Sequence, residues 1–90
     1  ITAAVRAMAL ELAGRKVRVN CISPGLVRTE MTEAEDSRMS KEQWARIAEL
    51  HPLGVGEPQD VARAAVFLLD PNNRWITGAD LVVDGGYTLH

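Results

Sequence analysis

Only two short runs of this sequence have the pattern of β-strands, and both are mostly apolar. Residues 17–23 alternate apolar and polar side chains up to Pro24-Gly25, and residues 79–83 stop at Asp84, which two glycines follow. Strands of this kind need cover on both faces and more than one neighbour. The sequence therefore predicts part of a larger sheet, covered by a second copy of the chain or by upstream polypeptide.

Helical patterns flank these runs. In residues 1–13, apolar side chains recur at helical spacing among many alanines, and we expect Gly14 to stop that helix. Another helix should begin at Pro58, which suits a first helical turn, and should end in the turn residues 70–73. Because the sequence begins inside a helical pattern at Ile1, we expect it to be a piece of a longer chain.

A long polar stretch follows the first strand. Residues 26–39 have poor periodicity, and a loop of this length inside a compact domain is usually functional. Ser40 with Gln43 fits a capping box, which should start a helix over residues 41–50. The order helix, strand, loop with helix, helix, strand predicts an α/β fold.

Composition excludes several classes of function. The net charge of -2 is spread along the chain without a basic stripe, which argues against a nucleic-acid partner. No apolar run reaches the ~20 residues needed to cross a membrane. The single cysteine, Cys21, can form neither an internal disulfide nor a metal cluster, so we expect a cytoplasmic protein without a metal site. We interpret His51 as stabilising a helix C-terminus and Asp84 as a turn residue.

In an open α/β sheet, ligands bind beyond the carboxyl ends of the strands, which here means residues 23–29. Pro24 fixes the turn, and Gly25 lets another group approach the backbone because it lacks a Cβ. Val27 offers main-chain groups, and Thr29 offers a hydroxyl that donates and accepts. These groups could hold a carboxamide or a phosphate, although an ordinary strand-to-loop turn explains the same residues.

Four segments, in order, resemble motifs of the classical short-chain dehydrogenases/reductases. Residues 17–29 resemble the family's "VNxxxPGxxxT" segment, and residues 9–13 look like its "LAxELA" helix end. Residues 56–62 are similar to its "GxPEDVA" helix start, and residues 77–86 are similar to its closing "TGxxxxVDGG". Each motif alone is weak, but the set is specific and covers nearly all of the chain. The 3-oxoacyl-carrier-protein reductase-like members look most similar.

The resemblance implies that residues 1–90 form the C-terminal part of a single Rossmann domain, a doubly wound parallel sheet that binds NAD or NADP. It implies that Pro24 and Gly25 border the nicotinamide, that the main chain of Val27 pairs with the carboxamide, and that Thr29 bonds to the carboxamide or diphosphate. It also implies that residues 26–56 form a substrate lid. The lid's apolar underside could come from three residues, for which helix packing is an equal explanation: Met31, Met39 and Trp44.

The same resemblance implies what this segment lacks. The family's glycine-rich loop, its Asn and Ser, and its Tyr-x-x-x-Lys pair all lie upstream of the matching region, so we predict no catalytic residue here. The intact protein is expected to be an oxidoreductase that interconverts a carbonyl and a hydroxyl on a small molecule, and to form homo-oligomers. The alternative is a truncated, inactive fragment that serves only as an oligomerisation or interaction module.

Overall fold

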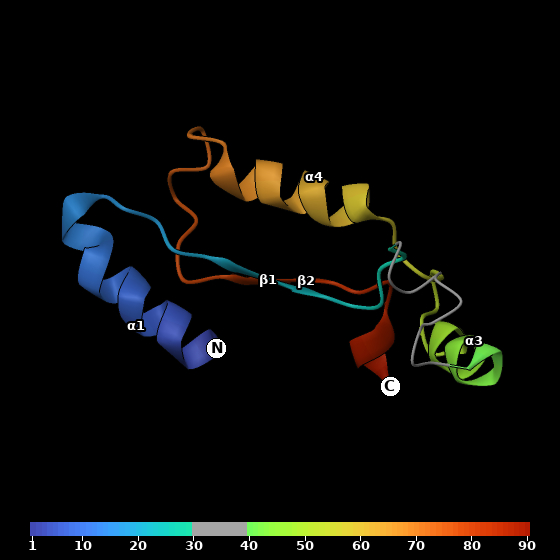
Figure 1. The fold of residues 1–90 in the computed structure, drawn as a ribbon. Helices are drawn as coiled ribbons and strands as arrows, with labels where there is room; N and C mark the ends of the chain where they lie inside the picture. The colour runs from blue at the N-terminus through green and yellow to red at the C-terminus, as the bar shows by residue number, and fades with distance from the viewer. Residues whose placement is uncertain (30–39) are drawn as a thin grey trace.

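The computed structural model describes residues 1–29 and 40–90. Two short parallel strands, β1 (Cys21–Pro24) and β2 (Asp80–Val83), pair with Cys21 opposite Asp80 and Pro24 opposite Val83. Helices α1 (Thr2–Leu12) and α4 (Pro58–Leu69) lie on opposite sides of this pair, and α3 (Lys41–Glu49) lies beyond its carboxyl end (Figure 1). The predicted α/β class with parallel strands is confirmed.

The strand predicted over residues 17–23 is wrong at both ends, because β1 begins at Cys21 and includes Pro24. The residues just before Cys21 contact residues 76–79 partly through side chains. The Asn20 side chain donates to Ile76 O at 3.1 Å and accepts from Ala79 N at 2.9 Å. Since side chains replace part of the backbone ladder there, an alternating pattern does not become regular strand.

The helix boundaries follow local chemistry at most ends. The Ser40 hydroxyl accepts from Gln43 N at 3.1 Å, and the Gln43 side chain accepts from Ser40 N at 3.0 Å, so the predicted capping box of α3 is confirmed. Pro58 begins α4 as expected. The prediction for Gly14 is wrong. The chain leaves α1 through a 3₁₀ turn, Ala13–Arg15, and the left-handed residue that closes it is Lys16, at φ 60°.

The apolar core of the described residues is small. Only Val5, Ala9 and Leu68 are buried hydrophobic residues in this part of the chain. The radius of gyration is 16.0 Å, against about 12 Å for a compact domain of this length. Large apolar side chains on α1 and α4, and on Ile1 just before α1, are exposed: Ile1, Leu10, Val66 and Leu69. These side chains are available for contact with further polypeptide.

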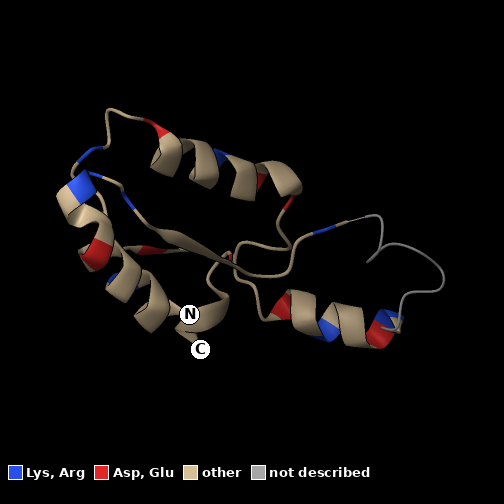
Figure 2. Ribbon diagram, turned by 60° about the vertical axis from the view of Figure 1, so that its left-hand side comes forward, with Lys and Arg blue, Asp and Glu red and all other residues tan. Residues whose placement is uncertain are grey.

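Charged residues of both signs are spread over the described helices and loops (Figure 2). Figure 2 shows Lys and Arg interspersed with Asp and Glu along the helices and loops. Among the described residues, no helix has the length and apolar character needed to cross a membrane. A short 3₁₀ turn, Tyr87–Leu89, follows β2 and brings the end of the chain back toward the carboxyl end of the strand pair (Figure 1).

Candidate functional site

The segment after β1 forms a second, shorter parallel contact. Gly56 N donates to Leu26 O at 2.9 Å, and Arg28 N donates to Gly56 O at 2.8 Å, which makes Val27 and Gly56 a parallel bridge. In an extended chain, successive residues direct their backbone groups to opposite sides. The N–H and C=O of Val27 therefore face away from Gly56, and no hydrogen bond within the described part of the chain engages them.

A cavity of about 350 Å³ borders this segment. Three parts of the chain line it: the segment after β1, the segment leading into α4, and the end of β2. Its lining includes Leu26, Val27, Gly56, Val83 and Asp84. The cavity thus lies at the carboxyl ends of both strands, which is the ligand position of open α/β sheets. On the side of this segment away from Gly56, Val27 presents one donor and one acceptor of the main chain that have no partner in the described part of the chain.

Gly25 has a packing reason to be glycine. A Cβ on this residue would lie 2.8 Å from Asp84 Cβ, 2.9 Å from Asp84 Cα and 2.9 Å from His51 Nε2. Gly25 N also donates to Val83 O at 3.0 Å, which continues the pairing of the strands by one residue. Glycine at position 25 therefore allows Asp84 and His51 of the same chain to pack closely against its backbone.

The remaining predicted site residues lie in different surroundings. Thr29 is exposed, four residues beyond Gly25 on the same segment. Trp44 is half-buried on α3. Met31 and Met39 lie outside the described residues. The predicted cofactor residues are already neighbours in the sequence, and the structure places them at the end of β1 and just after it. It describes one of the three predicted lid residues.

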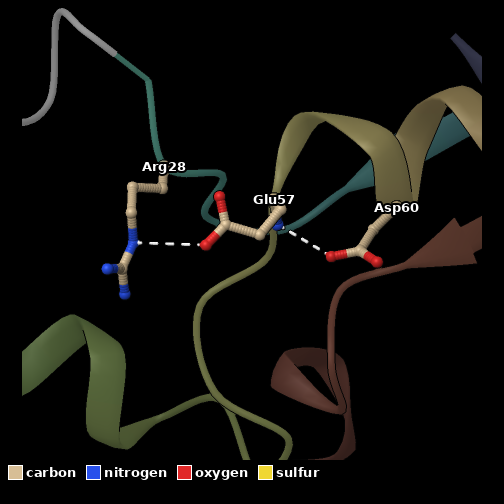
Figure 3. Close-up of polar contacts among 3 residues, drawn as sticks. All are labelled: Arg28, Glu57 and Asp60. Carbon is tan, nitrogen blue, oxygen red and sulfur yellow. Dashed lines mark hydrogen bonds and ion pairs between the residues drawn. The ribbon is translucent and has the colours of Figure 1, made fainter.

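An ion pair joins the same segment to α4. Arg28 Nε lies 3.7 Å from Glu57 Oε1, and both side chains are about half exposed (Figure 3). Glu57 N donates to Asp60 Oδ2 at 2.7 Å, which satisfies a backbone donor at the start of α4 (Figure 3). The capping carboxylate thus holds the helix start in place beside the segment, whereas the exposed ion pair adds little.

His51 makes contacts that the sequence interpretation did not anticipate. Its ring lies at the end of α3 and is 5 % exposed. Nδ1 is 2.8 Å from Ile47 O, as expected for a residue at a helix C-terminus. In addition, Nε2 accepts from Leu26 N at 3.0 Å, and the ring stacks on Tyr87 with centroids 4.8 Å apart. The only sequence signal was a histidine before Pro52, which does not indicate a partner 25 residues away.

Two titratable groups at the strands have shifted pKa values. The Thr88 hydroxyl lowers the pKa of Asp84, and the N–H groups of Gly86 and Thr88 lower it further. Partial burial raises the pKa of the Cys21 thiol, and the hydrogen bond and charge of Asp80 add to this. Cys21 therefore stays protonated at neutral pH and is a poor nucleophile.

Residues 1–88 match the sequence model of a family described as enoyl-(acyl carrier protein) reductase. The chain belongs to the short-chain dehydrogenase/reductase family. It is 49% identical over 86 residues to galactitol 2-dehydrogenase (L-tagatose-forming) of Cereibacter sphaeroides, covering 93% of this chain and 33% of that protein. It is 42% identical over 89 residues to a 3-oxoacyl-acyl-carrier-protein reductase of Chlamydia pneumoniae, covering 98% of this chain and 34% of that protein.

Solved structures of short-chain dehydrogenases share the fold. A putative 2-deoxy-D-gluconate 3-dehydrogenase from Agrobacterium tumefaciens with bound NADP is 34% identical, with a TM-score of 0.86 over 99% of this chain and 36% of that one. A 4-hydroxyisoleucine dehydrogenase complexed with NADH is 37% identical, with a TM-score of 0.85 and the same coverage. The predicted fold class, part of a Rossmann domain, is confirmed. The chain spans about a third of the length of the relatives it matches.

Proposed function

We propose that the protein containing this chain is an NAD(P)-dependent oxidoreductase that interconverts a carbonyl and a hydroxyl by hydride transfer. The observation that carries the proposal is the backbone of Val27. Its N–H and C=O are unpaired within the described residues, and Val27 lies just beyond the carboxyl end of β1. A nicotinamide carboxamide has one carbonyl acceptor and one NH₂ donor, so it can pair with both groups of a single residue.

In this proposal the segment after β1 binds and orients the cofactor. Val27 fixes the carboxamide, Pro24 and Gly25 border the nicotinamide ring, and the Thr29 hydroxyl bonds to the carboxamide or diphosphate. When bound, the cofactor supplies the hydride chemistry. We assign no catalytic residue to these ninety residues, which act by binding and orientation. Residues 26–56 are proposed to form the substrate lid of the domain, with the half-buried Trp44 of α3 supplying part of its apolar underside.

The proposal covers both NAD and NADP as the cofactor. Related structures contain NADH or NADP, which supports either choice. The substrate we propose is a small carbonyl compound or alcohol. A polyol or its ketose is the first class to test, because the relative named for galactitol oxidation shares 49% of the aligned residues. The lone thiol of Cys21 supports a cytoplasmic setting.

The test follows the Val27 amide in the full-length protein. The ¹⁵N–¹H signal of Val27 should shift when NADH or NADPH is added, and it should stay in place with ADP-ribose, which lacks the nicotinamide. Absorbance at 340 nm should then fall in the presence of a ketose or a β-ketoacyl thioester. A protein that binds neither cofactor, or that binds one while the Val27 signal stays unchanged, would contradict the proposal.

A second function, assembly into homo-oligomers, is supported by the exposed apolar side chains of α1 and α4. Leu10 is 82% and Leu69 is 77% exposed. In an oligomer these side chains would be covered by another copy. Light scattering of the full-length protein should give a mass of at least two chains, and Leu69→Glu should reduce it. Assembly without any cofactor binding or turnover would instead favour the inactive interaction module.

A further inference from the structure

His51 holds two hydrogen bonds whose partners settle its tautomer. Leu26 N–H can only donate, so Nε2 must carry a lone pair, and Ile47 O can only accept, so Nδ1 must carry the proton. The ring is therefore the neutral Nδ1-protonated form. The bond to Ile47 O belongs to the end of α3. The bond to Leu26 links α3 to a segment 25 residues earlier and is not needed to end a helix.

The surroundings of the ring leave it little freedom. His51 is the one buried polar residue among those that the structure describes. On one side, Nε2 would be 2.9 Å from a Cβ on Gly25, so only glycine leaves room for it. Tyr87 stacks on the ring at an interplanar angle of 24°. The charged group facing it is the Asp84 carboxylate, which Gly86 N and Thr88 N hold by hydrogen bonds. Three separate parts of the chain therefore fix the imidazole.

The position of Leu26 makes this link consequential. Leu26 directly precedes Val27, and its own carbonyl accepts from Gly56 N. Leu26 is thus held through its N–H by α3 and through its C=O by the segment leading into α4. Together these two bonds set the orientation of the next peptide, which carries the N–H of Val27. A shift of the α3 end would be transmitted through His51 to that N–H.

We propose that His51 is a positioning residue, which ties the end of helix α3 to the backbone that presents Val27 to the nicotinamide. The inference rests on the proposed function, because it assigns His51 a role at the same cofactor site. His51 does not touch the cofactor in this role. It acts through Leu26, so that the placement of α3 and the affinity for the cofactor are coupled.

The experiment uses three variants of the full-length protein. His51→Phe keeps a ring to stack on Tyr87 and removes both hydrogen bonds. His51→Asn keeps a polar atom near the Nδ1 position and has none at the Nε2 position. His51→Gln can place its carbonyl oxygen where Nε2 lies and can still accept from Leu26 N. The readouts are amide hydrogen exchange at Leu26 without cofactor, the dissociation constant for NADH or NADPH, and kcat against KM.

We expect Leu26 exchange to accelerate about tenfold in His51→Phe and His51→Asn, with a cofactor dissociation constant about tenfold weaker and a smaller change in kcat. His51→Gln should stay within about threefold of the wild type on each measure. If His51→Phe fails to fold, His51→Asn against His51→Gln carries the same comparison. Wild-type cofactor affinity in His51→Phe or His51→Asn would overturn the positioning role. A wild type that binds neither cofactor would overturn the proposed function, whatever the exchange at Leu26 shows.

Discussion

The two ends of the β1–β2 pair are held by different kinds of contact. At the amino end, side chains bond to backbone in addition to two backbone bonds: Arg18 donates to Ile76 O and Asp70 O, each at 3.2 Å, Asn20 bridges Ile76 and Ala79, and Gly78 N donates to Val19 O at 2.7 Å. At the carboxyl end, backbone pairs mostly with backbone, and a glycine permits close approach. The polar side chains at the amino end are thus engaged in hydrogen bonds that stabilise the fold.

The carboxyl end differs because it leaves a donor and an acceptor available. Val27 has neither group paired within the described residues, although its neighbours on both sides are bonded to Gly56. An N–H and a C=O without partners lower stability unless water or a ligand satisfies them. Changes at the amino end should therefore alter stability alone, whereas changes at the carboxyl end should alter stability and cofactor binding together.

The largest effect is expected for Gly25→Ala. The added Cβ would come within 2.9 Å of Asp84 Cα, a backbone atom directly after β2 that cannot move without moving the end of that strand. We expect the free energy of unfolding to fall by about 3 kcal/mol, at the upper end of overpacking costs. Chemical denaturation of the full-length protein measures it, and cofactor affinity should fall in parallel.

Gly14→Ala is the matched control for that substitution. A Cβ on Gly14 would meet no atom within 4 Å, so stability should stay unchanged or rise by up to ~1 kcal/mol. Equal losses for the two alanine variants would show that the carboxyl end is not more tightly packed than the solvated turn after α1.

Asn20→Ala tests the other end of the strand pair. It removes one donor and one acceptor that serve Ile76 O and Ala79 N, and we expect a loss of about 2 kcal/mol in the free energy of unfolding. The dissociation constant for NADH or NADPH should stay within twofold of the wild type, because the contacts at Val27 are untouched. The exposed Asn72→Ala is the control. A cofactor defect in Asn20→Ala comparable to its stability defect would remove the distinction between the two ends.

A smaller effect separates the two acidic residues at the start of α4. Asp60 accepts from Glu57 N at 2.7 Å, so Asp60→Ala should cost about 1 kcal/mol as the loss of a helix cap. Glu57→Gln removes only the half-exposed pair with Arg28 and should cost less than ~0.5 kcal/mol. Thermal unfolding at low and high salt measures both. The Glu57→Gln loss should fade at high salt, whereas the Asp60→Ala loss should fade only by the part that comes from the exposed ion pair of Asp60 with Arg63.

The smallest effect concerns pH. The pKa of Asp84 is lowered from its usual 3.8, chiefly by the Thr88 hydroxyl. A lowered carboxylate pKa adds stability that is fully present above the unfolded-state value and is lost as pH falls through the folded-state value. Unfolding curves between pH 7 and pH 3 should therefore show a decline below about pH 4 that is weaker in Asp84→Asn. An identical decline in both proteins would mean that Asp84 is no more stabilised in the folded state than in the unfolded chain.

Sequence patterns predicted the starts of α3 and α4 well because capping residues act within one helical turn. The Ser40–Gln43 capping box and Pro58 each act within one helical turn, and both behave as the sequence indicates. The prediction for Gly14 was wrong because a 3₁₀ turn follows α1, and the left-handed residue that ends this turn is Lys16. The first strand was placed too early because alternation cannot tell a backbone ladder from one in which Asn20 replaces part of the pairing.

The candidate site was less accessible to sequence reasoning. The position of residues 24–29 followed from the general rule for open α/β sheets. Its two defining features did not, because both are long-range contacts. The pairing of Val27 with Gly56 and the bond from Leu26 to His51 join segments more than twenty residues apart. Only the folded chain shows that the Val27 N–H and C=O lack partners among the described residues and that Leu26 N bonds to His51.

The bridge between Val27 and Gly56 also limits how this segment can vary over evolution. Recognition through main-chain groups does not depend on which side chain occupies the position, so Val27 can be replaced without deleting the donor or the acceptor. The number of residues in this segment, by contrast, cannot change without changing which groups face Gly56. One residue inserted or deleted between Gly25 and Arg28 would turn the next peptide toward Gly56, so that the unpaired N–H and C=O would no longer lie on the side away from Gly56. Selection on this stretch should therefore act on its length more strictly than on its residue types.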